Sequence, residues 1–177
     1  LSGGTGTLPF MLGMGFWQNG AFCVRIMTLT NPAREEAFLD AFQNWLSLHP
    51  FRLLVTYNGA TFDLPLMDTR FVLARRPNPL RTLDHLDLLR FARLFWKRDN
   101  PSCRLSHLGE RYLGLSREGD VPGQEIPALY NLCLRTGRFR ALERVRDHNA
   151  LDLVGLAGLL VLALDYLSGR REPPTPG

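Results

Sequence analysis

Apolar residues along the chain fall into runs that predict an alternation of strands and helices. Two apolar runs, residues 8–17 and 21–29, flank Asn19-Gly20, a dipeptide typical of the type I′ turn of a β-hairpin. Two shorter runs, residues 52–57 and 85–89, have the length of strands, and the first is expected to be a buried strand between helices. This order of elements predicts an α/β fold.

Helices are predicted between and after these strands. Asn31-Pro32 is typical of a helix start, with Asn as the cap and Pro in the first turn. That helix ends near His49-Pro50, and one face carries Phe38, Leu39, Phe42, Trp45 and Leu46. Further helices are expected over residues 63–75, from the end of the second short strand to Trp96, and over about 104–113, 126–136 and 139–167. We therefore expect a mixed sheet flanked by helices, in a single domain over residues 1–168, with a Pro-rich tail or linker over 169–177.

The composition is that of a folded protein with a mild basic excess. The 177 residues are 45% hydrophobic and 21% charged, with a net charge of +4, which suits a polyanionic partner. However, 20 of the 21 basic residues are Arg, and such a bias also arises from genome composition. Three cysteines without ligand spacing, Cys23, Cys103 and Cys133, predict a reducing, cytoplasmic setting. The most apolar stretch, residues 153–164, is shorter than the roughly 20 residues of a membrane span, so we expect a buried helix and no membrane contact.

Asp63 is the first polar residue that the fold does not obviously require. It follows the strand predicted at 52–57 and the turn Asn58-Gly59, and it opens the next helix. Ligands and catalytic groups gather at the carboxyl ends of strands in open α/β sheets, which favours a functional role. The alternative is that Asp63 is only a helix cap, a position that Asp often fills.

His148 and Asp152 form the second such pair. Residues four apart lie on the same face of a helix, so both side chains point the same way, on a face that continues with Leu156, Leu159 and Leu160. An Asp at the edge of such an apolar face needs a partner. A divalent cation is one candidate, and the alternative is an Asp–Arg pair with His148 at the surface.

Taken together, these acids indicate a site for a hard cation. Mg²⁺ and Mn²⁺ prefer carboxylate oxygens and water, and two such ions can activate water and stabilise the leaving oxygen of a phosphodiester. A nearby His148 can act as the general base for that water. The sequence contains neither a Walker-type phosphate loop nor a Gly-x-Ser-x-Gly elbow nor a His-Glu-x-x-His zinc motif, which would indicate other chemistry.

Several longer stretches resemble one known family, the YprB-like branch of the ribonuclease H-like superfamily, which comprises predicted bacterial exonuclease domains with a DEDD (DnaQ-type) site. The matching stretches cover nearly the whole chain in the right order: LSGGTGTLPFMLGMG, VTYNGATFDLPLMDTRF, HLDLLRFARLFW, DVPGQEIPALY with LRTG, and HNALDLVGLAGLL. The resemblance implies a ribonuclease H-like fold, two bound Mg²⁺ or Mn²⁺ ions, and a single-stranded DNA or RNA end as the substrate.

The resemblance also assigns roles to individual residues. It implies that Asp63 and Asp152 are the third and fourth metal-binding acids and that His148 orients or deprotonates the attacking water. It places Asn58, with Tyr57 beside it, near the substrate. Asp87 matches a family feature as an accessory ligand or supporting group, although an Asp at a strand end can equally cap the next helix.

The first two acids of the family pattern do not occur in the chain. Family members carry an Asp-x-Glu on a first strand immediately before LSGG, whereas this chain begins at Leu1 of that motif and contains no Asp-x-Glu. In the family fold that strand is central, between the hairpin and the strand at 52–57. We therefore expect a fragment of a longer reading frame that has little nuclease activity and marginal stability by itself.

Three functions follow from these observations, in order of preference. The first is a two-metal 3′-to-5′ exonuclease, and the second is a non-catalytic nucleic-acid-binding module of the same fold. The third is a scaffold domain that docks a partner protein, and only the Pro-rich tail supports it. The sequence does not distinguish DNA from RNA or exonuclease from endonuclease, and it indicates neither the oligomeric state nor any protein partner.

Overall fold

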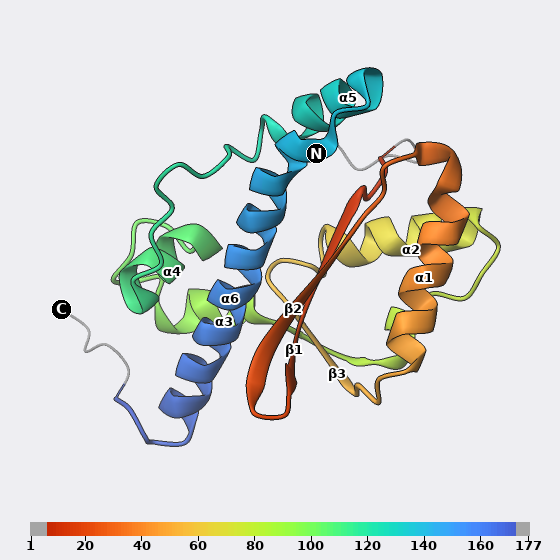
Figure 1. The fold of residues 1–177 in the computed structure, drawn as a ribbon. Helices are drawn as coiled ribbons and strands as arrows, with labels where there is room; N and C mark the ends of the chain where they lie inside the picture. Colours follow the sequence, from red (N-terminus) through yellow and green to blue (C-terminus); the bar gives the residue numbers. More distant parts are fainter. Residues whose placement is uncertain (1–6, 173–177) are drawn as a thin grey trace. The chain divides into compact units, whose positions relative to one another are not determined.

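The computed structural model of the chain describes residues 7–172 (Figure 1). The stretch LSGGTG and the Pro-rich end, residues 173–177, lie outside the described residues. Internal contacts divide the rest into two compact units, one with residues 7–11 and 27–90 and the other with residues 12–26 and 91–172. The last helix ends at Leu167, and the predicted single domain over 1–168 stays a prediction.

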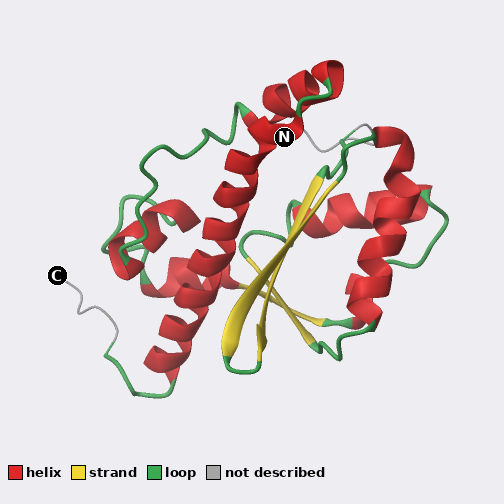
Figure 2. Ribbon diagram, in the orientation of Figure 1, coloured by secondary structure: helices red, strands yellow, loops and turns green. Residues whose placement is uncertain are grey.

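The first two strands form the predicted hairpin (Figure 2). Strand β1 is Met11–Gln18 and strand β2 is Ala21–Thr28. Asn19 and Gly20 have φ angles of 51° and 79°, and a type I′ turn requires positive φ at both positions. The local signal Asn-Gly is therefore sufficient to place this turn.

Strands β3 (Leu53–Thr56) and β4 (Asp84–Asp87) pair in parallel, with Thr56 opposite Asp87 at their carboxyl ends. The α/β class is confirmed, but the described strands form two separate two-stranded sheets, β1-β2 and β3-β4, rather than one mixed sheet. The strand predicted at 52–57 is present as β3, but the prediction that it is buried is wrong. Because β3 has a paired neighbour on one side only, its residues are half-buried or, in the case of Leu53, exposed.

The first unit packs two helices through a shared apolar face. Asn31 caps a short 3₁₀ turn, Pro32–Arg34, which leads into α1 (Glu35–Ser47). The next helix, α2 (Asp63–Leu73), follows β3. It ends two residues before Arg75, which adopts a left-handed φ of 54°. Arg70 of α2 forms a salt bridge with Glu35 of α1. The buried residues of this unit include Leu29, Phe38, Leu39, Phe42, Leu64, Met67 and Phe71.

The second unit is mostly helical. Its helices are α3 (Leu88–Phe95, which begins in the first unit), α4 (Leu105–Leu113), α5 (Ile126–Thr136) and α6 (Leu142–Leu167). A 3₁₀ turn, Phe139–Ala141, precedes α6, and another in the first unit, Pro79–Thr82, precedes β4. Helix α4 packs along α6, and the hairpin meets α6 at Gly13, where a side chain would lie 3.0 Å from Leu153. Trp96, Leu108, Val145 and Leu159 are fully buried.

Helix α6 is longer than the apolar stretch over residues 153–164, which by itself is too short to span a membrane. The helical segment Phe139–Leu167 is long enough to cross a membrane, and its most apolar 18-residue window has a mean hydropathy of 2.0 and is 28% buried. The same properties occur in core helices, and part of α6 packs against α4. Absence of a membrane association stays a prediction.

Candidate functional site

Asp87 organises the loop that follows β3. Its carboxylate accepts hydrogen bonds from the backbone amides of Asn58 at 2.7 Å and Ala60 at 3.1 Å, and from the amide of Leu89 at 3.1 Å. The first two bonds fix the turn between β3 and α2, and the third caps the start of α3. Asn58 adopts a left-handed φ of 65° within this turn. The helix-capping alternative for Asp87 is therefore what the structure contains, and a metal-binding role stays a prediction.

Asp63 lies beside this turn, at the first residue of α2. The position before it, the cap itself, is Phe62, so Asp63 is not the N-cap residue. Asp63 is exposed to solvent, and its carboxyl is therefore accessible to a ligand. The pKa of the Asp63 carboxyl is raised, mainly because the surrounding protein desolvates it and also because of the nearby negative charge of Asp87. A backbone hydrogen bond offsets part of this shift. Tyr57 is half-buried at the end of β3, on the same connection.

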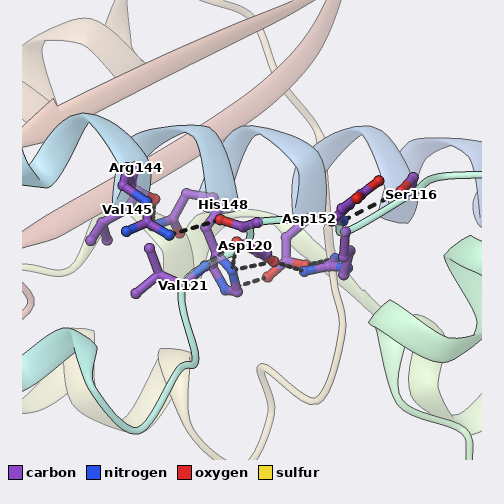
Figure 3. Close-up of polar contacts among 11 residues, drawn as sticks. Ser116, Asp120, Val121, Arg144, Val145, His148 and Asp152 are labelled. Carbon is purple, nitrogen blue, oxygen red and sulfur yellow. Dashed lines mark hydrogen bonds and ion pairs between the residues drawn. The ribbon is translucent and has the colours of Figure 1, made fainter.

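The second group of polar residues lies on α6 and on the loop between α4 and α5 (Figure 3). Nε2 of His148 is 3.5 Å from Oδ2 of Asp152, one turn along the helix, which confirms that the two side chains share a face. Nδ1 of His148 is 2.8 Å from both carboxylate oxygens of Asp120, a loop residue. Arg117, from the same loop, pairs with Asp152 and, at 3.0 Å, with Asp120.

The contacts and burial of these side chains agree with each of the two sequence-based interpretations only in part. Asp152 does have an arginine partner, as the structural alternative expected. His148 is not at the surface, because only 19% of its side chain is exposed, and Asp120 and Arg117 are each 17% exposed. His148 is thus half-buried and bound by a carboxylate, unlike the surface histidine that the alternative expected.

Sequence analysis did not identify Asp120 or Arg117. They lie 28 and 35 residues before their partners on α6, His148 and Asp152, and no helical or strand period relates them to that helix. The available signal was the stretch DVPGQEIPALY, which begins at Asp120 and was already among the family-matching segments.

The donor atoms fit a hard divalent cation only in part. Asp63 and Asp152 offer carboxylate oxygens, the ligands that Mg²⁺ and Mn²⁺ prefer, and Asp63 is accessible while Asp87 adds negative charge beside it. Asp63 belongs to the first unit, whereas His148 and Asp152 belong to the second. Within residues 7–172, no group of three or more His, Cys, Asp or Glu side chains is placed to hold an ion.

Comparisons with known proteins identify relatives over almost the full chain. A family model described as the RNase_H superfamily matches residues 1–164. A Bacillus subtilis (strain 168) protein with the name "Uncharacterized protein YprB" is 34% identical over 175 residues. These residues are 98% of this chain but 42% of that protein, so the chain spans less than half of this relative's length. No solved structure matches the chain.

Proposed function

The chain belongs to the RNase H superfamily, in a YprB-like family, and from this membership we propose that the protein containing it is a metal-dependent nuclease. The family suggests nuclease-type activity on nucleic acid. More specifically, we propose a 3′-to-5′ exonuclease of the DEDD type that acts on a single-stranded end. The observation that carries the proposal is the geometry of His148, which is half-buried, bound at Nδ1 and directed at Asp152 through Nε2.

In this proposal each residue has a separate task. Asp63 and Asp152 would hold Mg²⁺ or Mn²⁺ through carboxylate oxygens, and the ions, when bound, lower the pKa of water and stabilise the leaving oxygen. His148 accepts the proton of the attacking water at Nε2. Asn58 and Tyr57 lie on the connection before α2, where they can contact the substrate, while Asp87 holds that connection in shape.

A run of exposed arginines supports a nucleic-acid substrate. The segment from the end of α5 to the first turns of α6 carries five exposed arginines and two acids, Glu143 and Asp147; the arginines are Arg135, Arg138, Arg140, Arg144 and Arg146. Within the same segment Arg144 also donates a hydrogen bond to the Gly119 carbonyl at 2.8 Å. Positive charge of this density favours phosphate contacts, and on α6 His148 lies two residues after Arg146.

Residues 1–177 provide only part of the expected acids. Two of the four, Asp63 and Asp152, are present, and no Asp-x-Glu pair occurs among these residues. We therefore expect a polypeptide limited to residues 1–177 to hydrolyse little nucleic acid, and the decisive assay uses the full-length protein that contains them.

The test is cleavage of 5′-labelled single-stranded DNA and RNA by that full-length protein with Mg²⁺, with Mn²⁺ or with chelator. We expect products that shorten stepwise from the 3′ end only when metal is present, and no cleavage of circular single strands. Asp152→Asn and Asp63→Asn are expected to abolish cleavage, and His148→Ala to lower kcat by about 10²–10⁴-fold. Asp147→Asn, an exposed carboxylate change on the same helix, serves as the control and should leave cleavage unchanged. Cleavage that persists in Asp152→Asn would contradict the proposal.

A non-catalytic nucleic-acid-binding module is the second candidate. The pairing of Asp152 with Arg117 favours it, because a carboxylate neutralised by arginine does not require a metal ion. In that case the protein would bind nucleic acid with an affinity that falls steeply with salt, and no metal would produce turnover.

A further inference from the structure

Asp120 is held in place more firmly than a loop residue usually is. Besides the contact with His148, its Oδ1 accepts a hydrogen bond from the Val121 amide at 2.8 Å, and Arg117 donates to its Oδ2 at 3.0 Å. The loop is also tied to α6 by Arg144, which donates to the Gly119 carbonyl at 2.8 Å. These bonds link the loop to successive turns of α6 (Figure 3), so the position of the Asp120 carboxylate relative to His148 is determined by the fold.

The chemistry of the pair fixes where the imidazole carries its hydrogen. Burial tends to raise the pKa of Asp120, but hydrogen bonds from His148, the Val121 amide and Arg117 lower it, and the net shift is downward. Asp120 is therefore a carboxylate, which can only accept hydrogen bonds. Because both of its oxygens lie 2.8 Å from Nδ1 of His148, Nδ1 must carry the hydrogen. In the neutral ring Nε2 then has a free lone pair, and this atom faces Asp152.

We propose that Asp120 is a positioning residue that holds His148 as the Nδ1–H tautomer, with Nε2 free to take a proton from the attacking water. This inference rests on the proposed nuclease function. In the reaction the water oxygen forms a bond to phosphorus, its proton passes to Nε2, and the bond from phosphorus to the 3′ oxygen breaks. The 3′ oxygen then takes a proton from solvent, and the proton on Nδ1 stays with the Asp120 hydrogen bond throughout.

Asp120→Asn tests the inference because Asn keeps the size of the side chain and removes its charge. Outer-sphere carboxylates that orient a histidine typically contribute 10–100-fold to activity. In the full-length protein with Mn²⁺ we expect kcat to fall by about that factor while KM stays constant. Asp120→Glu, which restores the carboxylate, should recover part of kcat. An unchanged kcat in Asp120→Asn, or a loss of activity through KM alone, would overturn the inference.

A second readout does not depend on activity. In the full-length protein labelled with ¹⁵N-histidine, without metal and at about pH 8, where an ordinary imidazole is neutral, ring ¹⁵N shifts report the tautomer. The His148→Gln spectrum assigns the signal. We expect the Nδ1–H form for wild type and for Asp147→Asn, and a shift towards the Nε2–H form in Asp120→Asn with an unchanged melting temperature. An Nε2–H form in wild type would overturn the positioning role.

The two readouts separate the failure of each proposal. If the protein shows no nuclease activity but His148 is the Nδ1–H tautomer in wild type and not in Asp120→Asn, the nuclease proposal fails and the orientation of His148 by Asp120 is upheld. If activity is present but the tautomer does not depend on Asp120, the nuclease proposal stands and the positioning role is lost.

Discussion

The acids of the candidate site differ in what already binds them. The Asp87 carboxylate accepts three backbone amides, Asp120 binds His148, and Asp152 pairs with Arg117. Asp63 is exposed at the first position of α2, where the partial positive charge of the helix end favours an anion. At the residue scale, Asp63 is thus the acid most accessible to an incoming cation, whereas a metal ion at Asp152 has to compete with Arg117.

Asp68 lies outside the candidate site and is held by two other side chains. Asp68 accepts hydrogen bonds from Arg81 Nε at 2.9 Å and Asn78 Nδ2 at 2.8 Å. The hydrogen bond from Arg81 is the main cause of a pKa below the ordinary 3.8, partly offset by burial. A carboxyl whose folded pKa is lowered stabilises the protein above about pH 3.8, and this stability is lost as the pH falls through the folded pKa.

Asp68→Asn should therefore lower the free energy of unfolding at pH 7 and have little effect at about pH 2. Because 64% of the Arg81 side chain is exposed, solvent screens the pair, and we expect only a small loss. Urea denaturation of the full-length protein at the two pH values measures the difference, and added salt should reduce it. A loss of equal size at both pH values would show that the hydrogen bond from Asn78, rather than the charge, matters.

At the scale of elements, local sequence signals were sufficient for most helices and strands. Asn19-Gly20 placed the hairpin turn because few residues other than Gly and Asn adopt positive φ readily. The apolar spacing of Phe38, Leu39 and Phe42 placed α1, and all three are buried. The run over 85–89 was placed correctly, but β4 ends at Asp87 because its carboxylate caps the helix that begins at Leu88.

The parts of the site that depend on tertiary contacts were not predictable in this way. The Asp120 and Arg117 loop reaches α6 only through long-range hydrogen bonds, and such contacts leave no period in the sequence. The same is true of the parallel pairing of β3 with β4, which brings Asp87 to the amides of Asn58 and Ala60. Sequence spacing found the pair on one helix, His148 and Asp152, but not the residues that hold it.

Two glycines of α6, Gly155 and Gly158, provide a matched test of how tightly this helix packs against α4 and the residues that follow it. A methyl group added at Gly158 would lie 2.6 Å from Cδ1 of Leu113 in α4, whereas at Gly155 the nearest atom, Cδ1 of Leu115, would be 3.5 Å away. Both substitutions gain about 1 kcal/mol of helix propensity, but the first also costs about 1–3 kcal/mol of overpacking. The close approach at Gly158 therefore decides the sign of its effect.

Gly155→Ala should accordingly raise the free energy of unfolding by up to about 1 kcal/mol, and Gly158→Ala should lower it or leave no gain. Leu113→Ala makes room for the methyl group of Gly158→Ala. The free-energy changes of the two substitutions, measured by urea denaturation, should therefore not add in the double variant. Equal stabilisation by the two glycine substitutions would mean that α4 yields easily and that the helices are not closely packed there.

At the scale of the whole molecule, the candidate residues are divided between the two units. Asp63 and the turn held by Asp87 belong to the first unit, and Asp120, His148 and Asp152 belong to the second. The convergence of Asp63 and Asp152 on common ions is therefore a prediction from the family resemblance. If it holds, the two acids are linked energetically through the ions that both bind.

A double-mutant cycle on metal affinity tests this link directly. Asp63→Asn and Asp152→Asn are each expected to weaken Mn²⁺ binding to the full-length protein by at least about tenfold, roughly 1.4 kcal/mol, as measured by electron paramagnetic resonance of the free ion. When two residues bind the same ions, removing one already removes most of the affinity that the other contributes. The double variant should therefore bind Mn²⁺ only slightly more weakly than either single variant. Asp147→Asn should bind Mn²⁺ as the wild type does. Additive losses would instead mean two independent sites, one in each unit, and the two-metal centre shared by Asp63 and Asp152 would have to be abandoned.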